Sequence, residues 1–158
     1  MEQGAQFVYL LTHSSSIMMR QADQVLQERL GLGLSQLRIL TMLEHQPHVR
    51  QRRLADSLGQ TEASISRQIK LLSEKGFLSV SISPKSRREH LALLTPKAIK
   101  ITQAAKEVLE VHYRPLVESL GGKQLEKITN SLVKIHSQVC APGQPFGCDH
   151  PFEPKADG

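Results

Sequence analysis

Basic side chains are concentrated in the middle of this chain. Residues 50–100 contain eleven lysines and arginines and four acidic residues, a local charge of +7, whereas the whole 158-residue sequence carries +5. A basic segment with slightly acidic flanks is typical of a protein that binds a polyanion through one face, because each neutralised phosphate releases counterions. An ordinary solvated charged surface is the alternative interpretation.

Histidines and cysteines that could bind a metal ion or undergo redox chemistry lie near the C-terminus. His136 and Cys140 are four residues apart on one helix face, and Cys148 with His150 would complete a Cys2His2 metal site. Alternatively, the two thiols form a disulfide or sense an electrophile. Because the spacing is unlike that of common zinc modules, we favour a plain tail with reduced thiols and expect no metal or cofactor.

Catalytic motifs are missing from the sequence. It has no Gly-rich phosphate loop, nucleophile elbow or tight cluster of carboxylates. We therefore do not expect an enzyme.

Short helices and a hairpin are predicted to position the basic segment. Apolar spacing predicts one helix from about residue 8 to Gly31, a second capped by Ser35, and a third that ends at Gly59. Thr61 is predicted to cap a fourth helix. A hairpin follows, with apolar side chains predicted to face inward at Leu78, Val80, Ile82, Leu91 and Leu93.

Two longer helices are predicted after the hairpin. Thr95 and Pro96 are a strong helix start, and this fifth helix is expected to reach Leu120. Apolar residues of the sixth helix repeat at heptad-like steps: Leu125, Ile128, Leu132, Ile135 and Val139. The stripe fits either an intrachain core or a homodimer seam, and we favour the dimer because the long helices have more apolar face than a small domain covers.

The predicted fold is mainly α with a small β-hairpin wing: a winged helix-turn-helix with N- and C-terminal dimerisation helices. Residues 1–34 and 96–140 are assigned to dimerisation, 35–95 to DNA binding, and 141–158 to an irregular tail. The outward residues of the fourth helix then become candidates for base contacts. Arg67 suits a guanine, Ala63 a thymine methyl, and Ser64 or Ser66 a base or a phosphate.

The hairpin carries a resemblance to a known family. SRREHLALLT at 86–95, followed by PKA, resembles the wing of the MarR (multiple antibiotic resistance regulator) family, and TEASISRQIKLLSEKGFL at 61–78 is similar to its recognition helix and first wing strand. The resemblance implies a homodimeric transcriptional repressor on a near-palindromic duplex, with Arg88 in the minor groove. Ser86 stands where the family has an aspartate that holds this arginine, so Arg88 is freer or is oriented by Glu89.

The complete set of predicted DNA-contacting residues spans the third helix, the recognition helix and the wing. It comprises Arg52, Arg53, Thr61, Ala63, Ser64, Ser66, Arg67, Lys70, Lys85, Arg87 and Arg88. A winged-helix protein-interaction module without sequence-specific DNA binding is the alternative function.

A signal input is expected outside the DNA-binding segment. The family resemblance implies a small aromatic effector between the dimerisation and DNA-binding parts, and the candidate lining residues are His13, Met18, Met19 and Arg20, with His45 and His48. We favour the alternative, in which the methionines fill the core or an interface and the histidines lie on the surface. Cys140 and Cys148 are the candidate redox residues. No apolar run approaches the roughly 18 residues that span a bilayer, and the N-terminal residues lack a signal-peptide pattern. We therefore expect a cytoplasmic protein without a membrane partner.

Overall fold

The computed structural model describes residues 2–83 and 86–140, in which six helices and one hairpin follow in the predicted order. The elements are α1 (Glu2–Leu30), α2 (Leu34–His45), α3 (Gln51–Leu58), α4 (Glu62–Glu74), β1 (Leu78–Ser83), β2 (Ser86–Leu94), α5 (Pro96–Leu120) and α6 (Gly122–Val139). This arrangement confirms the predicted winged helix-turn-helix fold with terminal helices.

Local capping signals set the ends of several helices. Gly59 closes α3 with a left-handed φ of 63°, a conformation that glycine adopts without a steric penalty. The Thr61 hydroxyl accepts a hydrogen bond from the Ser64 amide at 3.1 Å and begins α4. Thr95 caps α5 in the same way, with Pro96 at its first position. These three predictions are confirmed.

The predicted cap of the second helix is wrong. Gly33, not Ser35, is the N-cap of α2, and glycine has no side chain to accept from the first amides. The Leu34 amide instead donates to Asp23 Oδ1 of α1 at 2.7 Å, and Gln36 Oε1 accepts from the Gly33 amide at 3.2 Å. A carboxylate from the preceding helix therefore replaces the local cap and also favours the positive end of α2.

The hydrophobic core lies where α2, α3 and α4 meet the base of the hairpin and the adjoining parts of α1 and α5. Its fully buried large side chains include Leu26, Leu40, Leu54, Ile65 and Leu72. Burying each such side chain contributes roughly 1.5–3 kcal/mol. Because α4 supplies Ile65, Ile69 and Leu72 to this core, its opposite side is left to solvent.

The hairpin pairs β1 with β2 in antiparallel register, with Leu78 opposite Leu94 and Val80 opposite Ala92. Leu78 and Ala92 are buried, as predicted for Leu78, but Val80 is 45% exposed. Leu93 is only half-buried, while Leu94 packs against the core. Val80 lies on the same face as Leu78 but is uncovered, because the hairpin extends beyond the core. The prediction for Leu93 is wrong because this residue, opposite Ser79, lies on the other face of the hairpin. The side chains of Ile82 and Leu91 lie outside the described residues.

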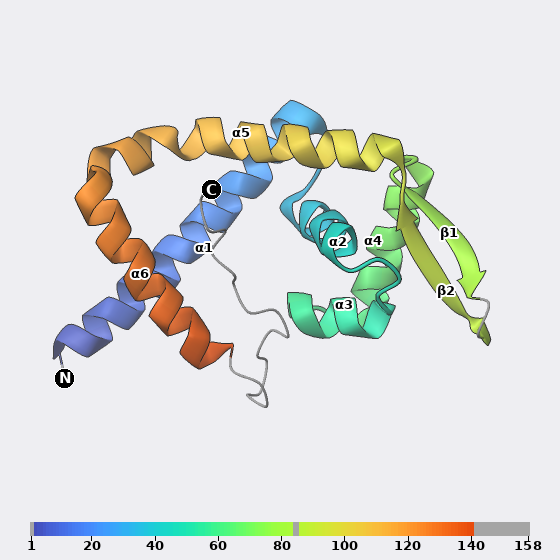
Figure 1. Cartoon of the computed structure of the whole chain (residues 1–158), viewed down its shortest axis with the longest axis horizontal. Helices are drawn as coiled ribbons and strands as arrows, with labels where there is room; N and C mark the ends of the chain where they lie inside the picture. The colour runs from blue at the N-terminus through green and yellow to red at the C-terminus, as the bar shows by residue number, and fades with distance from the viewer. Residues whose placement is uncertain (1, 84–85, 141–158) are drawn as a thin grey trace.

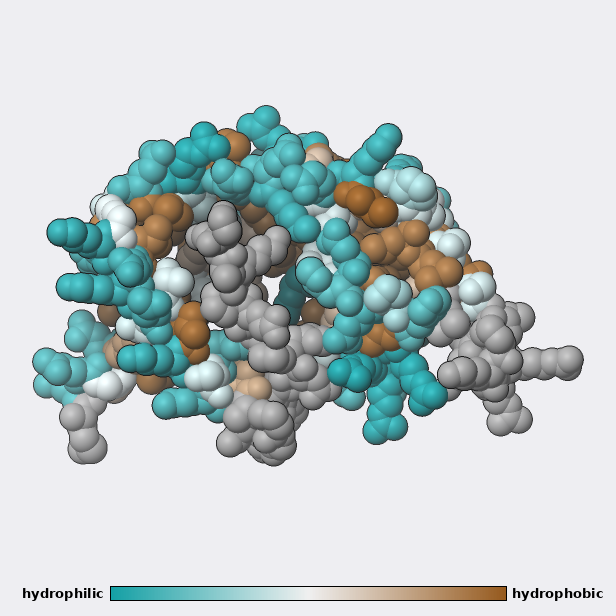
Figure 2. Space-filling model, viewed as in Figure 1, coloured by the Kyte–Doolittle hydropathy of each residue, from teal (hydrophilic) through white to brown (hydrophobic). Residues whose placement is uncertain are grey.

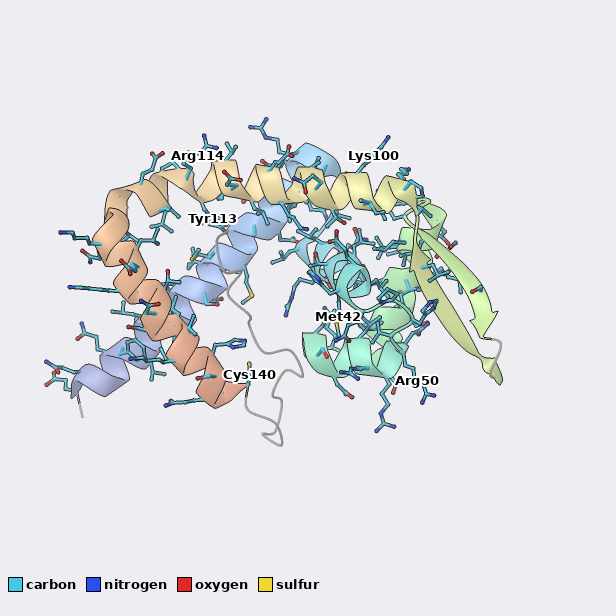
Figure 3. The ribbon with its side chains drawn as sticks, in the orientation of Figure 1. Met42, Arg50, Lys100, Tyr113, Arg114 and Cys140 are labelled. Atoms are coloured by element: carbon cyan, nitrogen blue, oxygen red, sulfur yellow. The ribbon has the colours of Figure 1, made fainter. Side chains whose placement is uncertain are left out.

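The three long helices form an arm that extends away from the DNA-binding part. Figure 1 shows α5 running across the molecule from the hairpin to α6, with α6 and the N-terminal part of α1 at the end away from the wing. The Lys106 ammonium lies 3.2 Å from Glu44, which ties α5 to α2. The Tyr113 hydroxyl donates to the Met18 carbonyl at 2.5 Å and ties α5 to α1. Figure 3 shows Tyr113 on the side of α5 that faces α1.

Much of the apolar surface of this arm is uncovered. Phe7, Val8, Tyr9 and Leu10 of α1 are each at least half exposed, and α6 buries none of its residues. Figure 2 shows apolar patches between the charged side chains of α5 and α6. Within a single chain, the hydrophobic core is therefore formed in the DNA-binding part, and much of the apolar surface of the arm remains exposed to solvent.

A substitution in the core tests this description of the fold. Leu54→Ala should lower the free energy of unfolding by about 2–5 kcal/mol, because it removes a fully buried side chain and leaves a cavity. Ile99→Ala, at a 53% exposed position of α5, is the control and should change it by less than about 0.5 kcal/mol. Chemical denaturation at one protein concentration compares them, and equal losses would contradict the assigned core.

Candidate nucleic-acid interface

The recognition helix presents one polar face. Ala63, Ser66, Arg67 and Lys70 are exposed on α4, and Ser64 is half-buried at the edge of the same face. The predicted base-contacting residues are therefore brought together on one helix side. Thr61 is also exposed, but its hydroxyl is engaged as the cap of the helix. This cap fixes the first turn of α4.

The helix that precedes the recognition helix adds positive charge beside it. Arg52 and Arg53 are exposed on α3, which packs against α4. Arg50 is the N-cap residue of α3, and Figure 3 places it at the edge of the helix-turn-helix near α3. Guanidinium groups at such positions suit phosphate contacts, which orient a protein on the duplex without reading its sequence.

The wing residues are located by the backbone. Arg87 and Arg88 follow Ser86 at the start of β2, where the ladder has a register shift between Ile82 and Ser83. Lys85 lies outside the described residues. The hairpin extends away from the core at the end of the molecule opposite α6, beside α4 (Figure 1).

A shallow pocket of about 580 Å³ lies between α1 and α2. It is lined by Ser16, Met19, Arg20, Asp23, Gln24, Leu34, Ser35 and Arg38. Of the predicted effector residues, Met19 and Arg20 are in this lining. Within the described part of the chain, no acidic side chain forms an ion pair with the guanidinium of Arg20 or of Arg38.

The other predicted effector residues lie elsewhere. His13 is exposed and stacks on Tyr9, with ring centroids 5.3 Å apart. Met18 uses its carbonyl to accept from Tyr113, and desolvation raises the pKa of that phenol above its ordinary value. His45 and His48 are exposed at the end of α2 and after it, and neither lines the pocket.

The C-terminal metal candidates are only partly described. His136 lies in the last turn of α6 and Cys140 is the half-buried residue that follows the helix. Cys148 and His150 fall outside the described residues. Among residues 2–83 and 86–140, no three His, Cys, Asp or Glu side chains gather as a metal-binding group.

Three functional candidates were missed from the sequence. They are Asp23, which accepts from the first amide of α2, Arg38, which lines the pocket, and Gln60, which bonds to Ser35 of α2. An unpaired arginine at an exposed helix position gives no sequence signal that separates it from a solvated surface residue. Gln60, directly before the predicted cap Thr61, stood at a position where a side-chain role could have been considered.

No helix in the described ranges combines the length and apolar character that a membrane span requires.

The fold and this face define a winged helix-turn-helix DNA-binding protein: a polar and basic recognition helix, a helix packed against it and an adjacent hairpin. The model of the MarR family matches residues 32–90. Residues 32–90, which hold the helix-turn-helix and part of the wing, are therefore similar to the DNA-binding part of MarR family transcriptional regulators. The expectation drawn from the wing and recognition-helix motifs is confirmed at this level.

Solved structures share the whole architecture. The regulator BldR from Sulfolobus solfataricus aligns with a TM-score of 0.74 at 20% identity, covering 87% of this chain and 96% of its own. A MarR family regulator from Rhodococcus sp. RHA1 aligns with a TM-score of 0.71 at 20% identity, covering 84% and 93%. CouR from Rhodococcus jostii RHA1, solved with p-coumaroyl-CoA, gives 0.70 at 19% identity, covering 86% and 92%. No curated protein sequence matches the chain.

Proposed function

We propose that this chain is a homodimeric repressor that binds a near-palindromic operator and releases it in response to a small aromatic acid. The observation that carries the proposal is the polar face of α4, which holds Ala63, Ser66 and Arg67 exposed beside a basic α3. A helix with this face fits the major groove, where Arg67 is suited to guanine. The dimer blocks polymerase by occupying the site.

The exposed apolar surface of the terminal helices supports the dimer. Residues 1–34 and 96–140 are assigned to dimerisation, 35–95 to DNA binding, and 141–158 to the tail. Exposed apolar side chains lie on α1, α5 and α6 of the arm, including Leu116, Val117, Ile128 and Leu132. A patch of this kind favours association, and a second copy related by a two-fold axis would cover the same surface on both chains. The two recognition helices would then reach half-sites about 34 Å apart.

The wing and the flanking basic residues complete the proposed DNA contacts. Arg88 would enter the minor groove, and Arg52, Arg53, Lys70, Lys85 and Arg87 would contact phosphates. A variant of MepR from Staphylococcus aureus has been solved bound to an oligodeoxyribonucleotide, and it aligns with 25% identity and a TM-score of 0.56, covering 84% of this chain and 97% of its own. The charge of residues 50–100 predicts affinity that falls steeply as salt rises.

The signal is proposed to act at the pocket between α1 and α2. Arg20 and Arg38 supply two guanidinium groups suited to a carboxylate, and Met19 supplies an apolar wall. The pocket joins a dimerisation helix to the DNA-binding part, so a ligand there favours one spacing of the two recognition helices over another. A metal or redox signal at His136, Cys140, Cys148 and His150 is the alternative input.

Two arginine substitutions test the DNA contacts. Arg67→Ala should flatten the preference for one base pair by about 1–3 kcal/mol, because it removes a base contact. Arg88→Ala should weaken binding more evenly across major-groove variants. Selection from a random duplex library, followed by salt titration of the selected operator, measures both. Salt-insensitive binding, or no selected sequence, would favour the protein-interaction alternative, and two parent-like variants would contradict the assigned contacts.

A charge placed on the α6 stripe tests the dimer. Leu132→Asp should shift the protein toward monomer in sedimentation and weaken operator binding by at least tenfold, because it puts a carboxylate in an apolar seam. Asn130→Asp adds the same charge off the stripe and is the control. A dimer of unchanged stability in Leu132→Asp would contradict this interface.

The signal site has its own test. A panel of benzoates and cinnamates, titrated against the parent protein by calorimetry, should contain a ligand that also releases operator DNA. Arg20→Gln should weaken that ligand about tenfold or more, because a charge-assisted hydrogen bond is lost, and should keep DNA affinity. Arg29→Gln, on α1 but outside the pocket lining, should behave like the parent. Equal effects of the two variants would contradict the site.

A further inference from the structure

Gln60 connects the DNA-binding elements through both ends of its side-chain amide. Its Nε2 donates to Ser35 Oγ in the first turn of α2 at 2.7 Å, and its Oε1 accepts from Ser64 Oγ in the first turn of α4 at 3.1 Å. Its own backbone amide donates to the Ala55 carbonyl at 2.9 Å. The half-buried side chain is therefore fixed between the turn and two helices.

This arrangement determines what Ser64 can offer to DNA. A hydroxyl has one proton to donate and two lone pairs that accept. The proton of Ser64 is committed inward to Gln60, so only a lone pair remains for a partner on the outer face. Phosphate oxygens accept but do not donate, and so they cannot bind Ser64 while this bond is kept. In the major groove, the donors are the amino groups of adenine (N6) and cytosine (N4).

We infer that Gln60 is a positioning residue for DNA reading, which holds Ser64 as a hydrogen-bond acceptor for a base amino group. The inference rests on the proposed function, because it requires α4 to lie in the major groove. It also narrows the role of Ser64 from a base or phosphate contact to a base contact of one polarity. The Ser35 bond keeps the amide oriented with its oxygen toward Ser64.

The test removes single hydrogen-bonding groups from the protein and from the DNA. Library selection with the parent and with Ser64→Ala first identifies the operator base pair whose preference depends on Ser64. In the parent operator, the adenine or cytosine of that pair is then replaced by purine or 2-pyrimidinone, which lack the amino group. As controls, 7-deazaadenine or 7-deazaguanine in the same pair removes only the N7 acceptor, and a methylphosphonate removes the charge of the nearest phosphate.

Loss of the amino group should weaken the parent about 3- to 10-fold, as expected for one hydrogen bond, and should leave Ser64→Ala unaffected. Gln60→Met, similar in volume but without hydrogen bonds, should lose most of this sensitivity. Gln60→Glu should keep it, because a carboxylate still accepts from Ser64, although its charge lowers affinity for all duplexes. Ser35→Ala is a milder second variant and should reduce the sensitivity while the fold, followed by thermal melting, is kept.

Several results would overturn the inference. One is that the contribution of Ser64 to DNA affinity is lost with the 7-deaza base or the methylphosphonate rather than with the amino group. Another is that Gln60→Glu binds equally well with and without the amino group. The third is that Ser64→Ala selects the same sequences as the parent. Failure of the parent to select any operator would instead overturn the proposed function itself. The two failures are therefore distinguishable in the first selection.

Discussion

Burial of one side of α4 is the constraint on which the rest of the structure depends. Ile65, Ile69 and Leu72 enter the core, and this fixes the rotation of the helix about its axis. Ala63, Ser66, Arg67 and Lys70 are then held outward on one face. Because the helix is also capped by Thr61 and tied to α2 through Gln60, its first turn is defined before DNA arrives. The reading face is thus a consequence of packing.

The arm differs from the DNA-binding part in how much of its apolar surface is buried. Parts of α1 and α5 pack against the core through buried residues such as Leu26 and Ala105. The remaining apolar side chains of the arm, such as Phe7 and Leu132, are exposed. In the proposed dimer, a second copy of the chain covers these apolar side chains. The pocket with Arg20 lies where arm and DNA-binding part meet, and a ligand there would act on the angle between them.

Features that depend on neighbouring residues were predictable from the sequence. Gly59, Thr61 and the Thr95–Pro96 pair set helix ends through local geometry, and their roles are confirmed. Contacts between distant segments were not predictable in this way. The cap of α2 comes from Asp23, eleven residues away, and the Gln60 bond reaches Ser35 across twenty-five residues. Val80 is exposed although it shares a face with Leu78, because alternation does not show how far the core covers the hairpin.

The central claim is that two copies of this chain place recognition helices in successive major grooves of one operator. Hydroxyl-radical footprinting of the parent protein on its selected duplex tests this most directly. A dimer of this kind should give two symmetric sets of protected sugars with centres about one helical turn apart, and the wings should protect the minor groove on each flank. A single asymmetric footprint, or uniform protection without a defined register, would contradict it.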